Sequence, residues 1–332
     1  MSVSPSTPNR RLRLLRHGGR ILGALGAVGL LVLIGLKWYL DATYFQGYDP
    51  SAPLQVEITE EKLEADYRWT RFYYRGFRED RVPAVMVAPR AAGGPLPCVV
   101  FVHGIGNDKE FMHRHGLDLP FVKAGFAFVC FDQLTRGERK LHRKSSWAEA
   151  EAFRVRAAYT VGDVRRLMDY LSTRSDIATN RIYLCGASYG AITGSTATAF
   201  DSRIRAATLV YGGGNLWRLL SAEAADELGQ WRLPAYLVGW YFGSVFDPIK
   251  YVGRIAPRPV LLQNGKADTV VSPAAARALQ EAAREPKKII WYEGDHLGKT
   301  SELDQDLVVR VVMDAIKFLQ EVDAQYQPNA AP

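Results

Sequence analysis

The sequence predicts an α/β protein in which a mostly parallel sheet lies between two layers of helices, preceded by one membrane-spanning helix. Two observations lead to this fold class. Short, continuous apolar runs alternate with longer segments of helical periodicity, which is typical of parallel strands buried on both faces. Residues 21–40 form one apolar stretch long enough to cross a bilayer. With 332 residues, 48% of them hydrophobic, the chain can bury a sizeable core.

The basic charge is concentrated before and within the apolar stretch. Six of the 42 basic residues and none of the 35 acidic residues lie in residues 1–40, so the rest of the chain is nearly neutral. We therefore expect no nucleic-acid partner. Five arginines precede the stretch and Asp41 follows it. The positive-inside rule thus predicts a basic cytoplasmic tail over 1–20, a transmembrane anchor over 21–40 and a single-pass protein of the inner (cytoplasmic) membrane, with its main domain outside the cytoplasm.

A cleavable signal peptide is the alternative interpretation of this segment. Its apolar region would be shorter, and it would need small residues at a cleavage site. Leu40-Asp41-Ala42 is a poor site of that kind, so the sequence favours an uncleaved anchor.

The remaining chain divides into a linker over residues 41–55 and a domain over 56–325. Residues 56–89 contain β-rich stretches broken by polar turns, which indicates antiparallel strands. Apolar runs then predict parallel strands at Cys98–Val102, Phe126–Phe131, Ile182–Cys185, Ala206–Val210, Val260–Leu262 and Ile289–Tyr292. Helical patterns cover Trp147–Leu171, Ala191–Ala199, Pro273–Ala283 and Leu303–Val322. Residues 212–256 are too long for a simple connection and rich in aromatic residues, so they predict an inserted cap.

One motif carries the strongest chemical signal. Gly186-Ala187-Ser188-Tyr189-Gly190 follows the predicted strand Ile182–Cys185 directly and precedes a predicted helix. Glycines in these places let a serine occupy a sharp strand-to-helix turn with its hydroxyl exposed. We therefore predict that Ser188 is a nucleophile.

A serine nucleophile needs a base, and the base needs an orienting acid. His296 follows the predicted strand Ile289–Tyr292 in a glycine-bearing loop, which makes it the predicted base. Asp268 lies just past the strand Val260–Leu262 and is the predicted acid. Three other aspartates are weaker candidates for the acid. Asp295 is adjacent to the histidine, Asp247 lies in the cap, and Asp163 precedes the serine in the chain.

Two backbone amides are predicted to stabilise the negative charge on an attacked carbonyl oxygen. One belongs to Tyr189, directly after the serine. The other is that of Ile105, because His103-Gly104-Ile105-Gly106 follows a predicted strand and its glycines let the backbone approach the site. His103 itself is interpreted as a residue that shapes this loop. The three cysteines, Cys98, Cys130 and Cys185, each lie in an apolar run and are predicted to be buried free thiols.

From about residue 65 to 322 the chain resembles the α/β-hydrolase superfamily, near its dienelactone-hydrolase, acetyl-esterase and prolyl-oligopeptidase-like branches. The resemblance rests on His103-Gly104-Ile105-Gly106, Phe131-Asp132-Gln133 with Arg136-Gly137-Glu138, Gly186-Ala187-Ser188-Tyr189-Gly190, Pro257-Arg258-Pro259-Val260 with Asn264-Gly265-Lys266-Ala267-Asp268, and Gly294-Asp295-His296. It implies an eight-stranded sheet, a Ser188–Asp268–His296 triad and no cofactor. Many relatives have Arg-Gly-His-Gly where this chain has Gln133-Leu134-Thr135-Arg136-Gly137, so we expect a reshaped loop there.

The leading hypothesis is a membrane-anchored serine hydrolase that cleaves a small-molecule carboxylic ester through an acyl-enzyme. Neither a metal nor a cofactor is expected. Two alternatives stay open, namely a peptidase or amidase with the same triad, and a non-catalytic binding protein that keeps the fold. The aromatic residues of the predicted cap suggest an apolar acyl or aryl group, but they would serve equally as a core of the cap itself.

Overall fold

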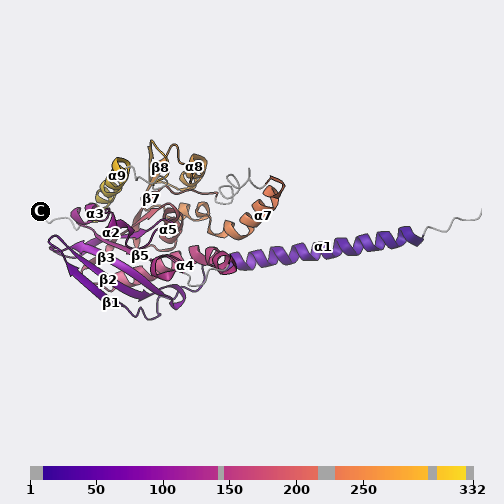
Figure 1. The fold of residues 1–332 in the computed structure, drawn as a ribbon, viewed down its shortest axis with the longest axis horizontal. Helices are drawn as coiled ribbons and strands as arrows, with labels where there is room; N and C mark the ends of the chain where they lie inside the picture. Colours follow the sequence, from indigo (N-terminus) through magenta and orange to yellow (C-terminus); the bar gives the residue numbers. More distant parts are fainter. Residues whose placement is uncertain (1–9, 141–145, 216–228, 298–304, 327–332) are drawn as a thin grey trace, which may run out of the picture. The chain divides into compact units, whose positions relative to one another are not determined.

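The structure, a computed structural model, divides at Gly47 into two units, Met1–Gln46 and Gly47–Pro332. It describes residues 10–140, 146–215, 229–297 and 305–326. In the first unit, α1 (Arg10–Thr43) contains a segment, Arg20–Thr43, that is long and apolar enough to cross a membrane (Figure 1). Its 24 residues extend about 36 Å, against about 30 Å of hydrocarbon.

The predicted anchor over residues 21–40 lies within this helix, which continues past both of its expected ends. Apolar side chains from Ile21 to Leu36 are exposed along it. Beyond them, Lys37 forms an ion pair of 2.7 Å with Asp41 one turn later. The helix therefore continues through Asp41, where the sequence predicted a linker.

Nine strands of the described residues form one sheet in the second unit. In chain order they are β1 (Glu57–Leu63), β2 (Tyr67–Arg75), β3 (Arg81–Pro89), β4 (Leu96–Val102), β5 (Ala127–Phe131), β6 (Ile177–Ala187), β7 (Ile204–Val210), β8 (Val260–Gly265) and β9 (Lys287–Tyr292). Their order across the sheet is β1-β2-β3-β5-β4-β6-β7-β8-β9. The pairs from β5 through β9 are parallel, and those among β1, β2, β3 and β5 are antiparallel.

All six predicted parallel strands are present, because continuous apolar runs suit strands that are covered on both faces. The eight-stranded count is wrong by one. The additional strand is β1, whose sequence Glu57-Ile58-Thr59-Glu60-Glu61-Lys62-Leu63 is charged and exposed. Such a composition suits the edge of a sheet, where charge discourages pairing with another chain. Because it contains no apolar run, the pattern that predicted the parallel strands does not predict this one.

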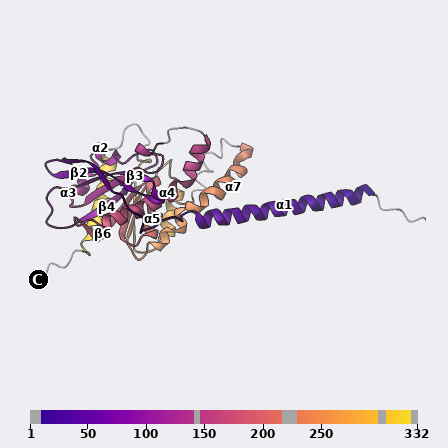
Figure 2. The same ribbon diagram turned by 90° about the horizontal axis from the view of Figure 1, so that it is seen from below.

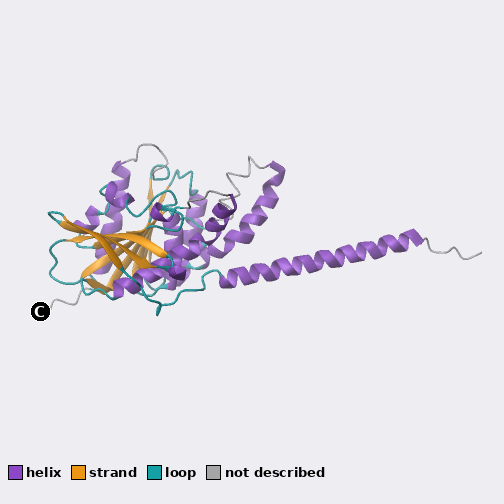
Figure 3. Ribbon diagram, turned by 60° about the horizontal axis from the view of Figure 1, so that its bottom comes forward, coloured by secondary structure: helices purple, strands orange, loops and turns teal. Residues whose placement is uncertain are grey.

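Helices cover both faces of the sheet (Figure 3). One face carries α4 (Ser146–Ser172), α5 (Tyr189–Phe200) and α8 (Pro273–Ala282). The other carries α2 (Phe111–Arg114), α3 (Leu119–Lys123) and α9 (Gln305–Asp323), which share one apolar core with the strands. The predicted free thiols are confirmed within the strands, and burial raises the pKa of Cys98 to about 12.

The predicted cap over residues 212–256 is only partly a separate structure. Residues 216–228 lie outside the described residues, and α7 (Arg232–Gly243) follows them. Short 3₁₀ turns at Pro248–Lys250 and Val252–Arg254 then pack against α5 and α8. The last part of the expected cap therefore belongs to the main body of this unit, because its apolar residues are buried there. Along the horizontal axis of Figures 1 and 2, α5 lies between α7 and the pair α2 and α3.

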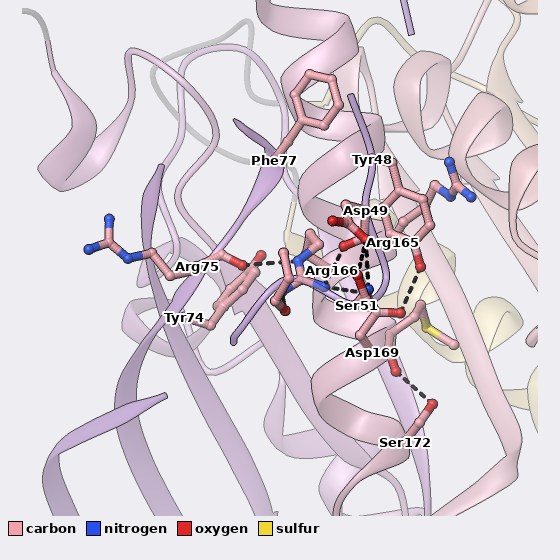
Figure 4. A network of polar contacts seen from close by, with 12 residues as sticks. Tyr48, Asp49, Ser51, Tyr74, Arg75, Phe77, Arg165, Arg166, Asp169 and Ser172 are labelled. Atoms are coloured by element: carbon pink, nitrogen blue, oxygen red, sulfur yellow. Dashed lines mark hydrogen bonds and ion pairs between the residues drawn. The ribbon is translucent and has the colours of Figure 1, made fainter. Parts of the chain in front are cut away.

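The second half of the expected linker is also part of the folded unit (Figure 4). The guanidinium of Arg166 on α4 is buried and donates to the carbonyl oxygens of Asp49 and Ala52, at 3.0 and 2.6 Å. It also pairs with Asp169 at 2.8 Å, and the same carboxylate accepts the Tyr48 hydroxyl at 2.7 Å. Residues 48–52 are thus fixed to α4 by hydrogen bonds that polar linker composition does not reveal.

We expect Arg166→Met to lower the free energy of unfolding by about 2–4 kcal/mol, because it removes a buried guanidinium that donates to two carbonyl oxygens and pairs with Asp169. Thermal unfolding monitored by circular dichroism measures the change. Arg165→Met is the matched control, since this neighbour stacks over the Tyr48 ring at 3.5 Å and donates to neither carbonyl. Equal losses of stability in the two variants would contradict the role given to Arg166.

Candidate active site

Ser188 occupies a strained turn between β6 and α5. Its φ of 54° and ψ of −118° lie in a region that non-glycine residues rarely adopt. The two glycines of the motif make this turn fit. A Cβ at Gly186 would lie 2.3 Å from the Gly190 carbonyl oxygen, and a Cβ at Gly190 would lie 1.9 Å from that of Val102. The glycines therefore allow α5 to start directly against the ends of β4 and β6, with the serine at the turn.

The structure brings together the three side chains that the sequence singles out. The Ser188 Oγ lies 3.0 Å from His296 Nε2, and His296 Nδ1 lies 2.8 Å from Asp268 Oδ2. The other oxygen of Asp268 accepts the amides of Val270 and Val271, at 2.9 and 2.7 Å. The carboxylate is buried and fixed by these bonds, so it can hold the imidazole with Nε2 directed at the serine.

The other acidic candidates have different partners. Asp295 accepts the amides of Thr269 and His296, each at 2.7 Å, and so joins the loops after β8 and β9. Asp247 accepts the amide of Ile249 at its own 3₁₀ turn. Asp163 is buried on α4 and pairs with Arg139 at 2.7 Å. Among these carboxylates, Asp268 is therefore the one whose bond to the imidazole the structure shows.

The residues predicted to bind an oxyanion lie at the same end of the sheet. Tyr189 is the first residue of α5, where a helix leaves its amide without an internal acceptor. Ile105 is 40% exposed and lines the pocket beside Ser188. A Cβ added at Gly104 would stand 3.6 Å from the Ser188 Cβ, so the loop after β4 approaches the serine closely.

His103 is buried beneath this loop. Its Nδ1 lies 2.8 Å from the Gly104 carbonyl oxygen, and the Gln133 side-chain amide donates to the His103 carbonyl at 2.6 Å. Burial lowers the pKa of His103, which keeps its ring neutral. These contacts fit the sequence interpretation of His103 as a residue that shapes the loop.

The loop that departs from the commonest family pattern is held by Asp132. Its carboxylate accepts the amides of Lys109 and Glu138, at 2.8 and 2.9 Å, and the Lys109 ammonium at 3.2 Å. Gly137 has a φ of 51° and lies so close that any Cβ there would meet this carboxylate. Nearby, the Arg136 guanidinium donates to the carbonyl oxygen of Ile105. This loop thus contacts the residue predicted to supply an oxyanion donor, through the peptide that follows it, a contact that the sequence did not indicate.

A pocket of about 580 Å³ opens beside Ser188 and His296. Its described walls come from the loop after β4, from α2 and α3, and from one face of α9; no described residue of α7 lines it. On α9 the lining residues are Val308, Val311, Val312 and Ala315, the spacing of a single helical face. The sequence left open whether the aromatic residues of the predicted cap contact the substrate or form a core of the cap, and no described residue of α7 supports the first interpretation. Trp231 and Trp240 are exposed instead, at 62% and 45%.

The chain belongs to the α/β hydrolase family. It matches the sequence profile described as "Alpha/beta hydrolase family" over residues 99–311, which include Ser188, Asp268 and His296. The matched range also contains β5 to β9 and the turn between β6 and α5.

Individual relatives are distant. The chain is 23% identical over 200 residues to a putative hydrolase, YtaP, of Bacillus subtilis, and 24% identical over 163 residues to the uncharacterized protein YfhR of Salmonella typhimurium. These alignments cover 55% and 46% of this chain, and 64% and 54% of the relatives, so less than two thirds of either relative is matched.

Solved structures share the fold. An acetyl xylan esterase from Paenibacillus sp. R4 superposes with a TM-score of 0.65 at 17% identity, covering 85% of this chain and 93% of its own. Acetyl xylan esterase 1 from Thermoanaerobacterium sp. gives 0.62 at 18% identity, covering 83% and 93%. A glucuronoyl esterase from Solibacter usitatus gives 0.55 at 15% identity, covering 86% and 91%.

Proposed function

We propose that the protein is a serine hydrolase that cleaves carboxylic esters through an acyl-enzyme, with Ser188, His296 and Asp268 as its triad. The observation that carries this proposal is the continuous chain of contacts from serine to histidine to aspartate, at 3.0 and 2.8 Å. Both distances are those of hydrogen bonds, and they connect a nucleophile, a base and an orienting acid in the order that proton transfer requires.

The proposed reaction has two halves. Ser188 Oγ attacks the ester carbonyl carbon while His296 Nε2 takes the hydroxyl proton, and Asp268 stabilises the resulting imidazolium. The amides of Tyr189 and Ile105 donate to the oxyanion. When the tetrahedral intermediate collapses, the carbon–oxygen bond to the alcohol breaks and His296 returns the proton to it. Water, deprotonated by the same histidine, then attacks the acyl-enzyme and releases the acid.

Ester cleavage is favoured over amide cleavage by the names of the structural neighbours, several of which are esterases. A panel of p-nitrophenyl esters and peptide anilides tests the choice. We expect kcat/KM for the best ester to exceed that for the best anilide by at least about 100-fold. Comparable turnover of anilides would identify a peptidase or amidase. A protein that turns over neither and resists a fluorophosphonate probe would be a binding protein with this fold.

We also propose that α1 anchors the protein in the inner membrane, with the second unit outside the cytoplasm. The exposed apolar surface of Arg20–Thr43 and the arginines before it support this topology.

We expect the full chain to remain in the membrane fraction after carbonate extraction, and a chain beginning at Gly47 to be soluble and active. N-terminal sequencing of the extracted protein distinguishes an anchor from a signal peptide. A mature N-terminus within or just after residues 21–43 would contradict the anchor.

A further inference from the structure

The pocket beside Ser188 is lined mainly by apolar side chains, in contrast to the polar groups of the proposed triad. Apart from Ser188, His296, Tyr211 and Asn107, the described side chains that line it are apolar or cysteine. Several of them are also closed off from solvent: Phe121, Val311 and Ala315 are each 2% exposed or less. The pocket therefore has an apolar, buried interior that begins at the proposed nucleophile.

Its size is far larger than the smallest ester substrates need. An apolar cavity of roughly 150 Å³ accommodates a benzene ring of six carbons. The pocket here measures about 580 Å³, and an acetyl group, with two carbons, would leave most of it empty. Water makes few favourable contacts in apolar surroundings. The ligand that this pocket favours is therefore an apolar chain that fills the space.

We propose that this pocket binds the acyl chain of a medium-chain ester, with about six to twelve carbons. The inference rests on the proposed function, since it places the acyl carbon on Ser188. The acyl group is the part assigned to the pocket because it remains bonded to the serine until water attacks, whereas the alcohol must leave before that step. The buried interior of the pocket therefore suits the acyl group, which stays bonded to the enzyme, better than the alcohol.

A chain-length series tests the proposal. With the p-nitrophenyl leaving group held constant, kcat/KM rises by at least about 100-fold from acetate to octanoate, given that each buried methylene contributes up to about fourfold. In a second series, with acetate held constant, lengthening the alcohol from ethyl to octyl changes kcat/KM by less than about fivefold. Rates are normalised to the number of sites that a fluorophosphonate labels, so partial unfolding does not affect the comparison.

Variants of the pocket walls locate the chain. Val312→Phe on α9 and Leu117→Phe between α2 and α3 each reduce the ratio of octanoate to acetate turnover by at least about tenfold, because the added ring occupies the space of the chain. Either variant suffices if the other fails to fold. Val309→Phe is the matched control: it is on the same helix, is 55% exposed and does not line the pocket, so the ratio is unchanged.

The outcomes separate this inference from the function on which it rests. A flat or falling acyl series, with acetate hydrolysis still dependent on Ser188, overturns the acyl pocket and leaves the esterase. A gain on the alcohol series alone overturns the assignment of the acyl side. Absence of hydrolysis for every ester overturns the proposed function and the acyl pocket with it.

Discussion

Ser188→Ala is expected to reduce ester hydrolysis by about 10⁵- to 10⁶-fold while leaving the fold intact. The substitution removes the one oxygen that His296 Nε2 contacts at 3.0 Å, so no acyl-enzyme can form. What remains should come from the oxyanion amides and substrate binding alone. Stability should change by less than about 1 kcal/mol, because the substitution replaces only a hydroxyl by a hydrogen atom, on a partly exposed side chain that lines the pocket. Steady-state kinetics and thermal unfolding measure the two effects.

Ser195→Ala provides the control for this variant. Ser195 lies on the same helix, α5, is fully buried and bonds only to the Ile192 carbonyl in the contacts shown for it, at 2.8 Å. The same substitution there should leave turnover close to that of the unmodified protein. If Ser188→Ala kept near-normal turnover, the nucleophile would have to be another residue.

Asp268→Asn is expected to lower kcat by about 10³- to 10⁴-fold. The Asn oxygen can still accept the amides of Val270 and Val271, so the loop should keep its shape. Its amide nitrogen would instead donate to His296 Nδ1 and force the proton onto Nε2. An imidazole in that tautomer cannot accept the serine proton. Kinetics with a p-nitrophenyl ester measure the loss.

Asp247→Asn distinguishes this effect from a general one. Asp247 is also buried and also accepts backbone amides, those of Asn215 and Ile249. We expect its replacement to change kcat less than about threefold, because its shown contacts do not include the imidazole. A severe loss from Asp247→Asn with a mild one from Asp268→Asn would reassign the acid.

The parts of the fold that could be predicted were those with a local signature. The six buried parallel strands have continuous apolar runs, and Gly186-Ala187-Ser188-Tyr189-Gly190 follows one of them directly. Asp268 and His296 follow two others, and parallel strands bring their carboxyl ends to one edge of the sheet. Sequence position relative to strands was therefore enough to identify residues that meet in space.

The features that escaped prediction depend on contacts between distant segments. Residues 48–52 have the composition of a linker, yet a buried arginine on α4 binds their carbonyl oxygens. The contact of Arg136 with the Ile105 carbonyl joins two loops 31 residues apart. The pocket needs α2, α3 and one face of α9 together, and no local pattern in the sequence shows that these segments meet. In each case the decisive partner was not local.

The central claim is that Ser188 carries the acyl group during turnover. Mass spectrometry of the protein quenched in acid during hydrolysis of p-nitrophenyl octanoate tests it directly, after digestion and fragmentation of the tryptic peptide 182–203. We predict an octanoyl adduct on Ser188, on neither Tyr189 nor Ser195, that disappears in Ser188→Ala. Rapid hydrolysis with an adduct on another residue, or undiminished hydrolysis by Ser188→Ala, would contradict the account.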